Sequence, residues 1–213
     1  MKEFGKTETA SVFARLKEVM TTNKDELTAL DAAIGDGDLG MVMEKAFSLI
    51  ADNAAEIQKN ASDPGKMFAM AGMEIGKKAP STMGTLLASG FMKAGKAVSG
   101  KDTINAADMA VFFQAFADAI SALGGAKPGE KTVLDVLYPA AQAAAEAAKE
   151  KPGDLKAVLA AAQAAGQRGL EDGRTLQSKH GRPGIFREKT IGMTDPGSLA
   201  GVLILRAFCE AAS

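Results

Sequence analysis

Apolar residues recur at intervals of three and four along almost the whole chain, and this spacing restricts the possible folds more than any other feature. Val12, Leu16 and Val19 form one such stripe near the start, and Phe112 and Phe116 belong to another in the middle. This period indicates amphipathic helices. Strand signals are scarce, because neither a sustained alternation of β-branched residues nor a hairpin dipeptide between such runs occurs. The chain is therefore expected to be all-α.

The connections between the expected helices are short and rich in glycine and proline. Examples are "SDPG", "EKPGD" and "TDPGS", and none of them resembles a linker between domains. Asn23 with Glu26 resembles a capping box that opens a helix. Further helices are expected over residues 132–149, 154–173 and 198–212. Short connections make successive helices antiparallel, which predicts a single domain over residues 1–213, built as an up-and-down bundle or barrel of about eight helices.

Charge and composition exclude several classes of function. The 25 basic and 26 acidic residues nearly balance, so no net charge draws the chain toward nucleic acid or an anionic membrane. The N-terminal sequence "MKEFGKTETA" lacks the apolar core of a signal peptide, and no run of eighteen apolar residues follows. The single cysteine, Cys209, excludes an internal disulfide and fits a reducing compartment. We expect a soluble cytoplasmic protein that binds neither nucleic acid nor membrane.

The chain contains one histidine, His180, and no tryptophan. A Ser–His–Asp triad or a histidine-rich zinc centre would have to be built around that single imidazole. Carboxylates, and the ions that they bind, are therefore expected to carry any chemistry.

The stretch "AIGDGDLG" contains the pattern G-x-G-x-x-G at Gly35, Gly37 and Gly40. In a dinucleotide-binding fold this loop follows a strand and exposes bare backbone to a pyrophosphate. Here a helical pattern precedes the loop, and the carboxylates of Asp36 and Asp38 would repel phosphate. The dinucleotide interpretation is therefore disfavoured.

The carboxylates have a role if a cation lies between them and a phosphate, because Mg²⁺ prefers oxygen ligands of this kind. On a continuous helix Asp36 would point about 140° away from Asp31 and Asp38. If the helix ends near Gly35, the loop can fold back and all three acids can converge. An EF-hand is excluded. If Asp36 were the first ligand of an EF-hand loop, the twelfth position, which needs a bidentate acid, would be Phe47. A simple turn with solvated acids remains the alternative.

Three further stretches join this loop in a recognisable order: "STMGT" at 81–85, "GEKTVLD" at 129–135 and "GRPGIFREKTIGMTDPGS" at 181–198. Together with "LDAAIGDGDLG" at 30–40, they make the chain resemble the nucleotide-binding L subunit of dihydroxyacetone kinase. The resemblance covers essentially the whole chain. It implies an antiparallel eight-helix barrel with a nucleotide, ADP or ATP, and two Mg²⁺ ions at one end.

The resemblance also implies residue roles. The metal ligands would be Asp31, Asp36 and Asp38. The nucleotide would lie against Leu39, Gly40, Met41, Val42, Thr82, Met83, Gly84, Gly124, Val133, Arg182, Asp195, Pro196 and Gly197. Arg182 would reach a phosphate, although it could instead be a surface arginine, and Asp195 could be a helix N-cap. No other catalytic group is expected on this chain, because in this family a histidine on a separate K subunit holds the substrate.

The family also implies partners and a choice of phosphoryl donor. One branch keeps ADP bound and rephosphorylates it from a phosphohistidine protein of the phosphotransferase system, and the other consumes free ATP. The chain departs from both branches, since Leu39 stands where they have histidine or cysteine. Met41 and Val42 replace polar residues, and "PSTMG" replaces a glycine-serine loop. We expect a kinase subunit for dihydroxyacetone or a similar short keto sugar, in a homodimer or heterocomplex. The alternatives are a regulatory nucleotide-binding partner and a ligand-free helical scaffold.

Overall fold

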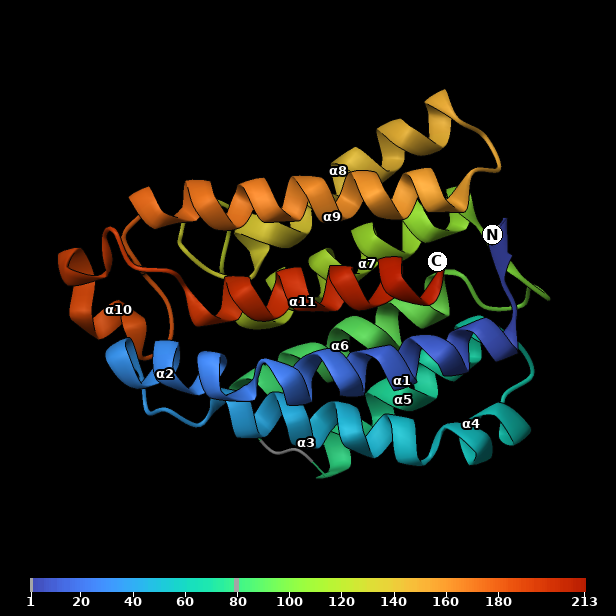
Figure 1. The fold of residues 1–213 in the computed structure, drawn as a ribbon, viewed down its shortest axis with the longest axis horizontal. Coiled ribbons are helices and arrows are strands. Elements are labelled where there is room, and N and C mark those ends of the chain that lie inside the picture. Colours follow the sequence, from blue (N-terminus) through green and yellow to red (C-terminus); the bar gives the residue numbers. More distant parts are fainter. Residues whose placement is uncertain (1, 79–80) are drawn as a thin grey trace.

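A computed structural model describes residues 2–78 and 81–213. Within these residues the chain forms helices and one two-stranded ribbon (Figure 1). The longer helices are α1 (Lys6–Thr22), α2 (Lys24–Ile34), α3 (Leu39–Asp52), α5 (Pro64–Lys78), α6 (Thr82–Ala97), α7 (Ala106–Gly124), α8 (Leu134–Glu150), α9 (Leu155–Asp172) and α11 (Pro196–Ala211). The short elements are α4 (Ala54–Asn60), α10 (Pro183–Phe186), η1 (Gly173–Thr175), η2 (Arg187–Thr190), β1 (Glu3–Phe4) and β2 (Ile104–Asn105).

Eight helical units in the described residues close into a ring. The helices α1 and α2 form one unit, since only Asn23 separates them. The order around the ring is α1–α2, α3, α5, α6, α7, α8, α9 and α11, and α11 packs back against α1. Successive members run in opposite directions (Figure 1). The predicted all-α, up-and-down arrangement of about eight helices is confirmed.

Phenylalanine side chains fill the interior of this ring. The ring of Phe68 on α5 lies 4.6 Å from that of Phe112 on α7 and 5.7 Å from that of Phe208 on α11, measured between centroids. These three helices are not neighbours in the ring, so their side chains meet in its middle. All three rings are almost completely buried. The interior is therefore a packed core that holds the helix ends in fixed positions.

The break between α1 and α2 differs in detail from the sequence prediction. A helix does begin after Asn23, but the Asn23 side chain does not accept a capping hydrogen bond. Its amide nitrogen instead donates to the carbonyl of Val19, 2.7 Å away. The predicted capping box is wrong, because the amide faces back toward the preceding helix rather than toward the first turn of α2.

One helix in the described part of the chain, α7, is long and apolar enough to cross a membrane by length and composition. Half of its apolar window is buried inside the protein. It packs between α6 and α8 as a member of the ring. We therefore interpret α7 as a core helix.

The alternation of helix directions gathers every second connection at the same end of the ring. The end of α2, the starts of α3, α6, α8 and α11, and the short helix α10 lie together at one end (Figure 1). The ribbon, in which Glu3 pairs with Asn105, lies at the other end with the two chain termini. Sequence segments more than a hundred residues apart thus meet at the α10 end.

Candidate nucleotide and metal site

Three carboxylates converge where α2 gives way to α3. Asp31 lies in the last turn of α2, Asp36 in the connecting loop, and Asp38 at the N-cap of α3. One oxygen from each lies within 4.8 Å of the others. The predicted convergence is confirmed. The donor set of three carboxylates suits a hard divalent cation such as Mg²⁺.

Asp31 also shapes the loop that carries the other two acids. One of its carboxylate oxygens accepts hydrogen bonds from the backbone N–H groups of Asp38 at 3.0 Å and of Leu39 at 3.1 Å. Gly37 takes a φ of 73°, which is the left-handed region that glycine adopts without strain. The loop therefore folds back over the end of α2 and brings Asp36 and Asp38 next to Asp31.

Gly40 is required by the close contact of two helices. A Cβ atom at this position would lie 2.1 Å from the carbonyl oxygen of Lys24 and 2.2 Å from the hydroxyl of Thr28, both on α2. Gly40 is buried there and does not line the cleft described below. It lets α3 begin directly beside α2, so that its first turn faces the three acids.

The charges of the acidic loop influence one another. Burial, followed by the charges of Asp36 and Asp31, raises the pKa of the Asp38 carboxyl, and Arg182 partly opposes the increase. The Arg182 guanidinium lies 2.7 Å from Asp36 through its Nε atom, and more than half of its side chain is exposed. Arg182 thus partly neutralises Asp36 and Asp38, and the negative charge that remains on the acidic loop favours the binding of a cation.

A cleft of about 490 Å³ opens beside the acids at the α10 end of the ring. All but three of the predicted site residues line it, namely Asp31, Asp36, Asp38, Leu39, Val42, Thr82, Met83, Gly124, Val133, Arg182, Asp195, Pro196 and Gly197. Leu86 on α6 and Ile120 on α7 add apolar wall. The cleft therefore joins an acidic mouth to an apolar interior. The ligand roles of these residues stay a prediction.

The three predicted residues outside the lining are Gly40, Met41 and Gly84. The side chain of Met41 is 53% exposed. The N–H group of Gly84 donates to the Ser81 hydroxyl, which caps α6 at 2.8 Å. Pro80, which precedes this cap, lies outside the described residues.

The first turn of α3 leaves backbone donors available. The Leu39 N–H group donates to Asp31 and the Val42 N–H group donates to the Asp38 carbonyl. The Asp38 side chain makes no capping hydrogen bond. Within the fully described residues 31–42, the N–H groups of Gly40 and Met41 have no intramolecular acceptor. Such groups at a helix N-terminus favour an anion, for example a phosphate.

Asp195 is a helix N-cap, as one of the two sequence interpretations has it, and its position also leaves the nucleotide role open. It caps α11, since its carboxylate accepts a 2.6 Å hydrogen bond from the Ser198 N–H group, and it also lines the cleft. Burial raises its pKa to about 6, while the bonds from Ser198 and the charge of Lys131 oppose the increase.

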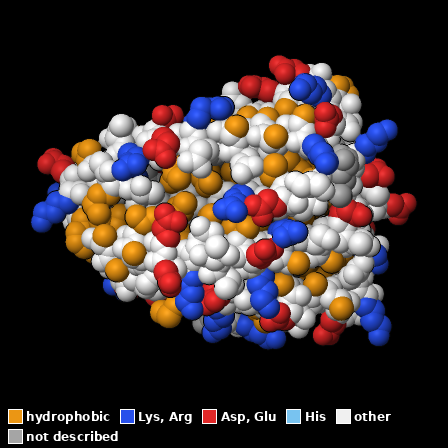
Figure 2. Space-filling view, in the orientation of Figure 1, with side chains coloured by type: hydrophobic (Ala, Val, Ile, Leu, Met, Phe, Trp, Pro, Cys, Tyr) orange, Lys and Arg blue, Asp and Glu red, His pale blue; other side chains and the backbone are white. Residues whose placement is uncertain are grey.

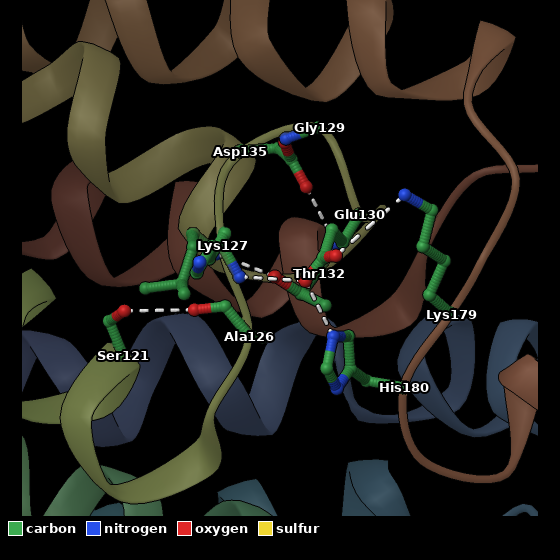
Figure 3. Close-up of polar contacts among 10 residues, drawn as sticks. Ser121, Ala126, Lys127, Gly129, Glu130, Thr132, Asp135, Lys179 and His180 are labelled. Carbon is green, nitrogen blue, oxygen red and sulfur yellow. Dashed lines mark hydrogen bonds and ion pairs between the residues drawn. The ribbon is translucent and has the colours of Figure 1, made fainter.

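Two lining residues with ionisable side chains, Lys131 and His180, were not predicted as site residues. Lys131 is almost completely buried, and His180, considered incidental from the sequence, lies 2.6 Å from the carboxylate of Glu130. Figure 3 shows the Glu130 carboxylate between the loop that follows α7 and the Lys179–His180 segment. The only sequence signal for these contacts is the charged pair in "GEKT", which lies far from His180 in the chain.

A comparison with known protein families identifies the family to which the chain is similar. The DAK2 domain matches residues 33–210 of the chain. The chain belongs to the DAK2 domain family. The match covers all the acids and loops that line the cleft except Asp31, which precedes it by two residues. The family resemblance drawn from the sequence motifs is confirmed.

Several known proteins are similar to this chain along most of its length. The ADP-binding subunit DhaL of the PEP-dependent dihydroxyacetone kinase of Escherichia coli is 26% identical over 97% of this chain and 97% of its own length. The L-erythrulose 1-kinase of Mycolicibacterium smegmatis is 29% identical over 94% of this chain but only 34% of its own length.

Solved structures show the same fold. The native dihydroxyacetone kinase of C. freundii superposes with a TM-score of 0.71 at 25% identity, covering 99% of this chain and 36% of that one. The same kinase in complex with AMP-PNP and Mg²⁺ gives a TM-score of 0.69 at 24% identity, covering 95% and 33%. This chain thus spans about a third of the larger kinases and nearly all of the separate E. coli subunit.

Proposed function

We propose that this chain, over residues 1–213, is the nucleotide-binding subunit of a dihydroxyacetone-type kinase and binds Mg–ADP or Mg–ATP in the cleft. The observation that carries the proposal is the convergence of three carboxylates within 4.8 Å beside unpaired helix N-terminal donors. Acids alone would repel a nucleotide, and N–H groups alone would not select one. The names of the E. coli subunit and of the C. freundii complex support the same ligands.

Each part of the cleft has a role in this proposal. Asp31, Asp36 and Asp38 would hold the cations, two by analogy with the family. Bound Mg²⁺ would neutralise phosphate charge, which is the main requirement of phosphoryl transfer. Leu39 and Val42 line the cleft, and the N–H groups of Gly40 and Met41, which lie between them in the chain, would turn toward phosphate oxygens at its edge. Thr82, Met83 and Gly84 would lie along the other side, Gly124 and Val133 would border the base or ribose, and the last loop, Asp195 to Gly197, would close the site.

The acceptor in this proposal is dihydroxyacetone or a similar short keto sugar on a partner K-type subunit. The names of the E. coli and Mycolicibacterium relatives support both sugars. In this chain His180 pairs with Glu130, and we assign the substrate-holding histidine to the partner. A phosphohistidine protein of the phosphotransferase system is the second candidate partner. We place the complex, a homodimer or heterocomplex, in the cytoplasm.

The surface around the cleft supports the docking of a partner. Apolar side chains gather at the α10 end of the molecule in Figure 2. Ile185 and Phe186 of α10, and Ile191 directly after η2, are exposed although they are large and hydrophobic. Exposed apolar groups beside a polar cleft are typical of an interface.

The test is to combine the chain with a K-type subunit, Mg²⁺, dihydroxyacetone and either ATP or a phosphohistidine donor. We expect phosphorylated triose only when all components are present. Native mass spectrometry of the purified chain separates the donors, because retained ADP supports rephosphorylation in place. Absence of any melting shift with Mg–ADP would refute nucleotide binding itself.

A second candidate is a regulatory partner that binds nucleotide without turnover. The apolar residues Leu39, Met41 and Val42 favour it, because they remove polar groups that the kinases of the family carry near the phosphates. The retained acids favour the enzyme. A chain that binds Mg–ADP tightly but yields no phosphorylated triose with either donor would support the regulatory role.

A further inference from the structure

The loop that carries Arg182 to the cleft has little apolar packing of its own. From Arg174 to Thr190, a segment that is fully described, the only buried residues are Ser178 and Thr190. The helix α10 within it has no buried residue, and Ile185 is 79% exposed. The hydrophobic core therefore does not fix this loop, and polar contacts must determine where Arg182 lies.

One buried lysine makes three of these polar contacts. The Nζ atom of Lys131 donates to the carbonyl oxygens of Arg174 at 3.3 Å, Leu176 at 3.1 Å and Thr190 at 2.7 Å. The first two carbonyls belong to the chain leaving α9, and the third belongs to the chain returning toward α11. An ammonium group has three protons, and all three are used here. Lys131 thus joins the two legs of the loop at its base.

The base of the loop has a second connection beside the ammonium group. The Ser178 N–H group donates to the Thr190 hydroxyl at 2.9 Å, and that hydroxyl donates to the Arg187 carbonyl at 2.6 Å. The buried residues of the segment therefore belong to the same polar cluster as the Lys131 contacts. If the ammonium group were removed, the carbonyl of Thr190 would lose the partner that holds this cluster to the rest of the protein.

The backbone of Lys131 indicates that this side chain is specifically required. Its φ of 57° lies in the left-handed region, which is unfavourable for a side chain with a Cβ atom. Such conformations persist when the surrounding contacts impose them, and they gather at functional sites. Glycine would adopt this φ without strain, but glycine has no ammonium group.

Glu130, the neighbouring residue, holds the next part of the same loop. Its carbonyl accepts from the Lys179 N–H group at 3.2 Å, and its carboxylate lies 2.6 Å from Nε2 of His180 and 3.7 Å from Nζ of Lys179 (Figure 3). The Lys127 N–H group donates to the same carboxylate at 2.9 Å. Two consecutive residues therefore fasten the loop on both sides of its base, and Arg182 follows His180 by two positions.

We infer that Lys131, assisted by Glu130, is a positioning residue that fixes the 174–190 loop and so holds the Arg182 guanidinium at the acidic mouth of the cleft. The inference rests on the proposed function, because it assigns Arg182 to the nucleotide. Lys131 lines the cleft, but its three protons are bonded to carbonyls. It therefore acts through Arg182 and not by touching a phosphate.

The first experiment tests the loop without any ligand. Lys131→Met keeps most of the apolar stem and removes the three hydrogen bonds, and Lys127→Met is the matched control on the same loop. In the folded apo protein we expect trypsin to cleave after Lys179, Arg187 and Lys189 at least tenfold faster in Lys131→Met than in the parent. The control should be cleaved at these bonds at the parental rate. Equal rates in all three proteins would overturn the inference.

The second experiment is a double-mutant cycle on Mg–ADP affinity measured by calorimetry. We expect Arg182→Ala and Lys131→Met each to weaken binding about tenfold, and the double variant to bind within twofold of Arg182→Ala. A double variant weakened by the product of the two effects would mean that Lys131 acts independently of Arg182, which overturns the inference. An Arg182→Ala variant that binds like the parent would overturn it as well.

The two experiments distinguish a failure of the proposed function from a failure of the inference about Lys131. If the parent binds no Mg–ADP, the proposed function fails, while the proteolysis result still decides whether Lys131 fixes the loop. If Lys131→Met does not fold, as judged by circular dichroism, Glu130→Gln replaces it in both experiments. That variant removes the charge of the carboxylate facing His180 and should show smaller effects in the same directions. Parental proteolysis in Glu130→Gln, or additivity with Arg182→Ala, would overturn the inference.

Discussion

Asp36→Asn separates the binding of a cation from the stability of the empty protein. The Asp36 side chain is partly exposed and forms an ion pair with the mostly exposed Arg182 at 2.7 Å. Exposed pairs of this kind contribute about 0–1 kcal/mol. The substitution also relieves the repulsion that helps to raise the pKa of Asp38. We therefore expect the free energy of unfolding of the apo protein to change by less than about 1 kcal/mol.

The effect on Mg²⁺-dependent binding should be much larger. Two unit charges 4 Å apart interact by about 4 kcal/mol at an effective dielectric constant of about 20. When the cation binds, the parent protein loses the contact between Arg182 and Asp36. This loss offsets about 1 kcal/mol of the attraction between the cation and Asp36. About 3 kcal/mol remains, which corresponds to a loss of Mg–ADP affinity on the order of a hundredfold.

Thermal denaturation gives a direct measure of this loss. At 100 times its dissociation constant, Mg–ADP should stabilise the parent by about 2.7 kcal/mol, and a hundredfold weaker variant by about 0.4 kcal/mol. For a chain of this length these values correspond to melting shifts of about 5–11 °C and about 1 °C.

The control for this measurement is Asp52→Asn. Asp52 ends α3 and forms an exposed 2.6 Å pair with Lys17, away from the cleft lining. This variant should keep the full melting shift. If Asp36→Asn keeps the parental shift, or if the parental shift persists when EDTA removes the metal, the assignment of Asp36 as a cation ligand is wrong.

Three further predictions concern stability. Asp31→Asn should lower the free energy of unfolding by about 1–2 kcal/mol even without ligand, because its carboxylate accepts two backbone hydrogen bonds; chemical denaturation would detect this, and unchanged stability would contradict the role of Asp31 in shaping the loop. Gly40→Ala should cost about 1–3 kcal/mol, since its methyl group would lie 2.1 Å from the Lys24 carbonyl; a parental melting temperature would show that α3 can shift at little cost. The pKa of Asp195 is raised to about 6, so its ionisation penalises the folded state as pH rises from about 4 to 6. Asp195→Asn should therefore gain about 2 kcal/mol relative to the parent between pH 4 and pH 7, and a difference that does not change with pH would contradict the burial of a charged group there.

The fold was predictable because its signals are local. The 3.6-residue period of apolar side chains and the short glycine and proline connections together imply antiparallel helices, and the closed ring has this arrangement. The failure at Asn23 is also instructive. A capping box specifies residue types, but the direction of an amide depends on its neighbours, and the Val19 carbonyl is the acceptor here. Local patterns therefore locate the helix start better than they locate its hydrogen bonds.

The candidate site was predictable only in part. The convergence of the acids of the α2–α3 loop could be predicted from the sequence, because they lie within eight residues. The glycines between them also allow a turn with positive φ, which Gly37 adopts. The contacts of Lys131 could not, since its three acceptors lie more than forty residues away and are backbone carbonyls. A carbonyl oxygen is common to every residue type and leaves no signature in a sequence. The pairing of Glu130 with His180 was missed for a related reason, because it depends on how two distant loops cross.

The backbone geometry also limits what the unusual residues at the start of α3 can change. Leu39, Met41 and Val42 lack the polar side chains that the family resemblance leads us to expect at these positions, yet an N–H donor is independent of the side chain beside it. The donors available to a phosphate are those of Gly40 and Met41, and the Met41 side chain points away into solvent. The substitutions therefore remove side-chain hydrogen bonds, worth about 1 kcal/mol each, and leave the acids and the helix N-terminus intact. Their expected consequence is a weaker hold on the nucleotide, whether the chain acts as a kinase subunit or as a regulatory partner.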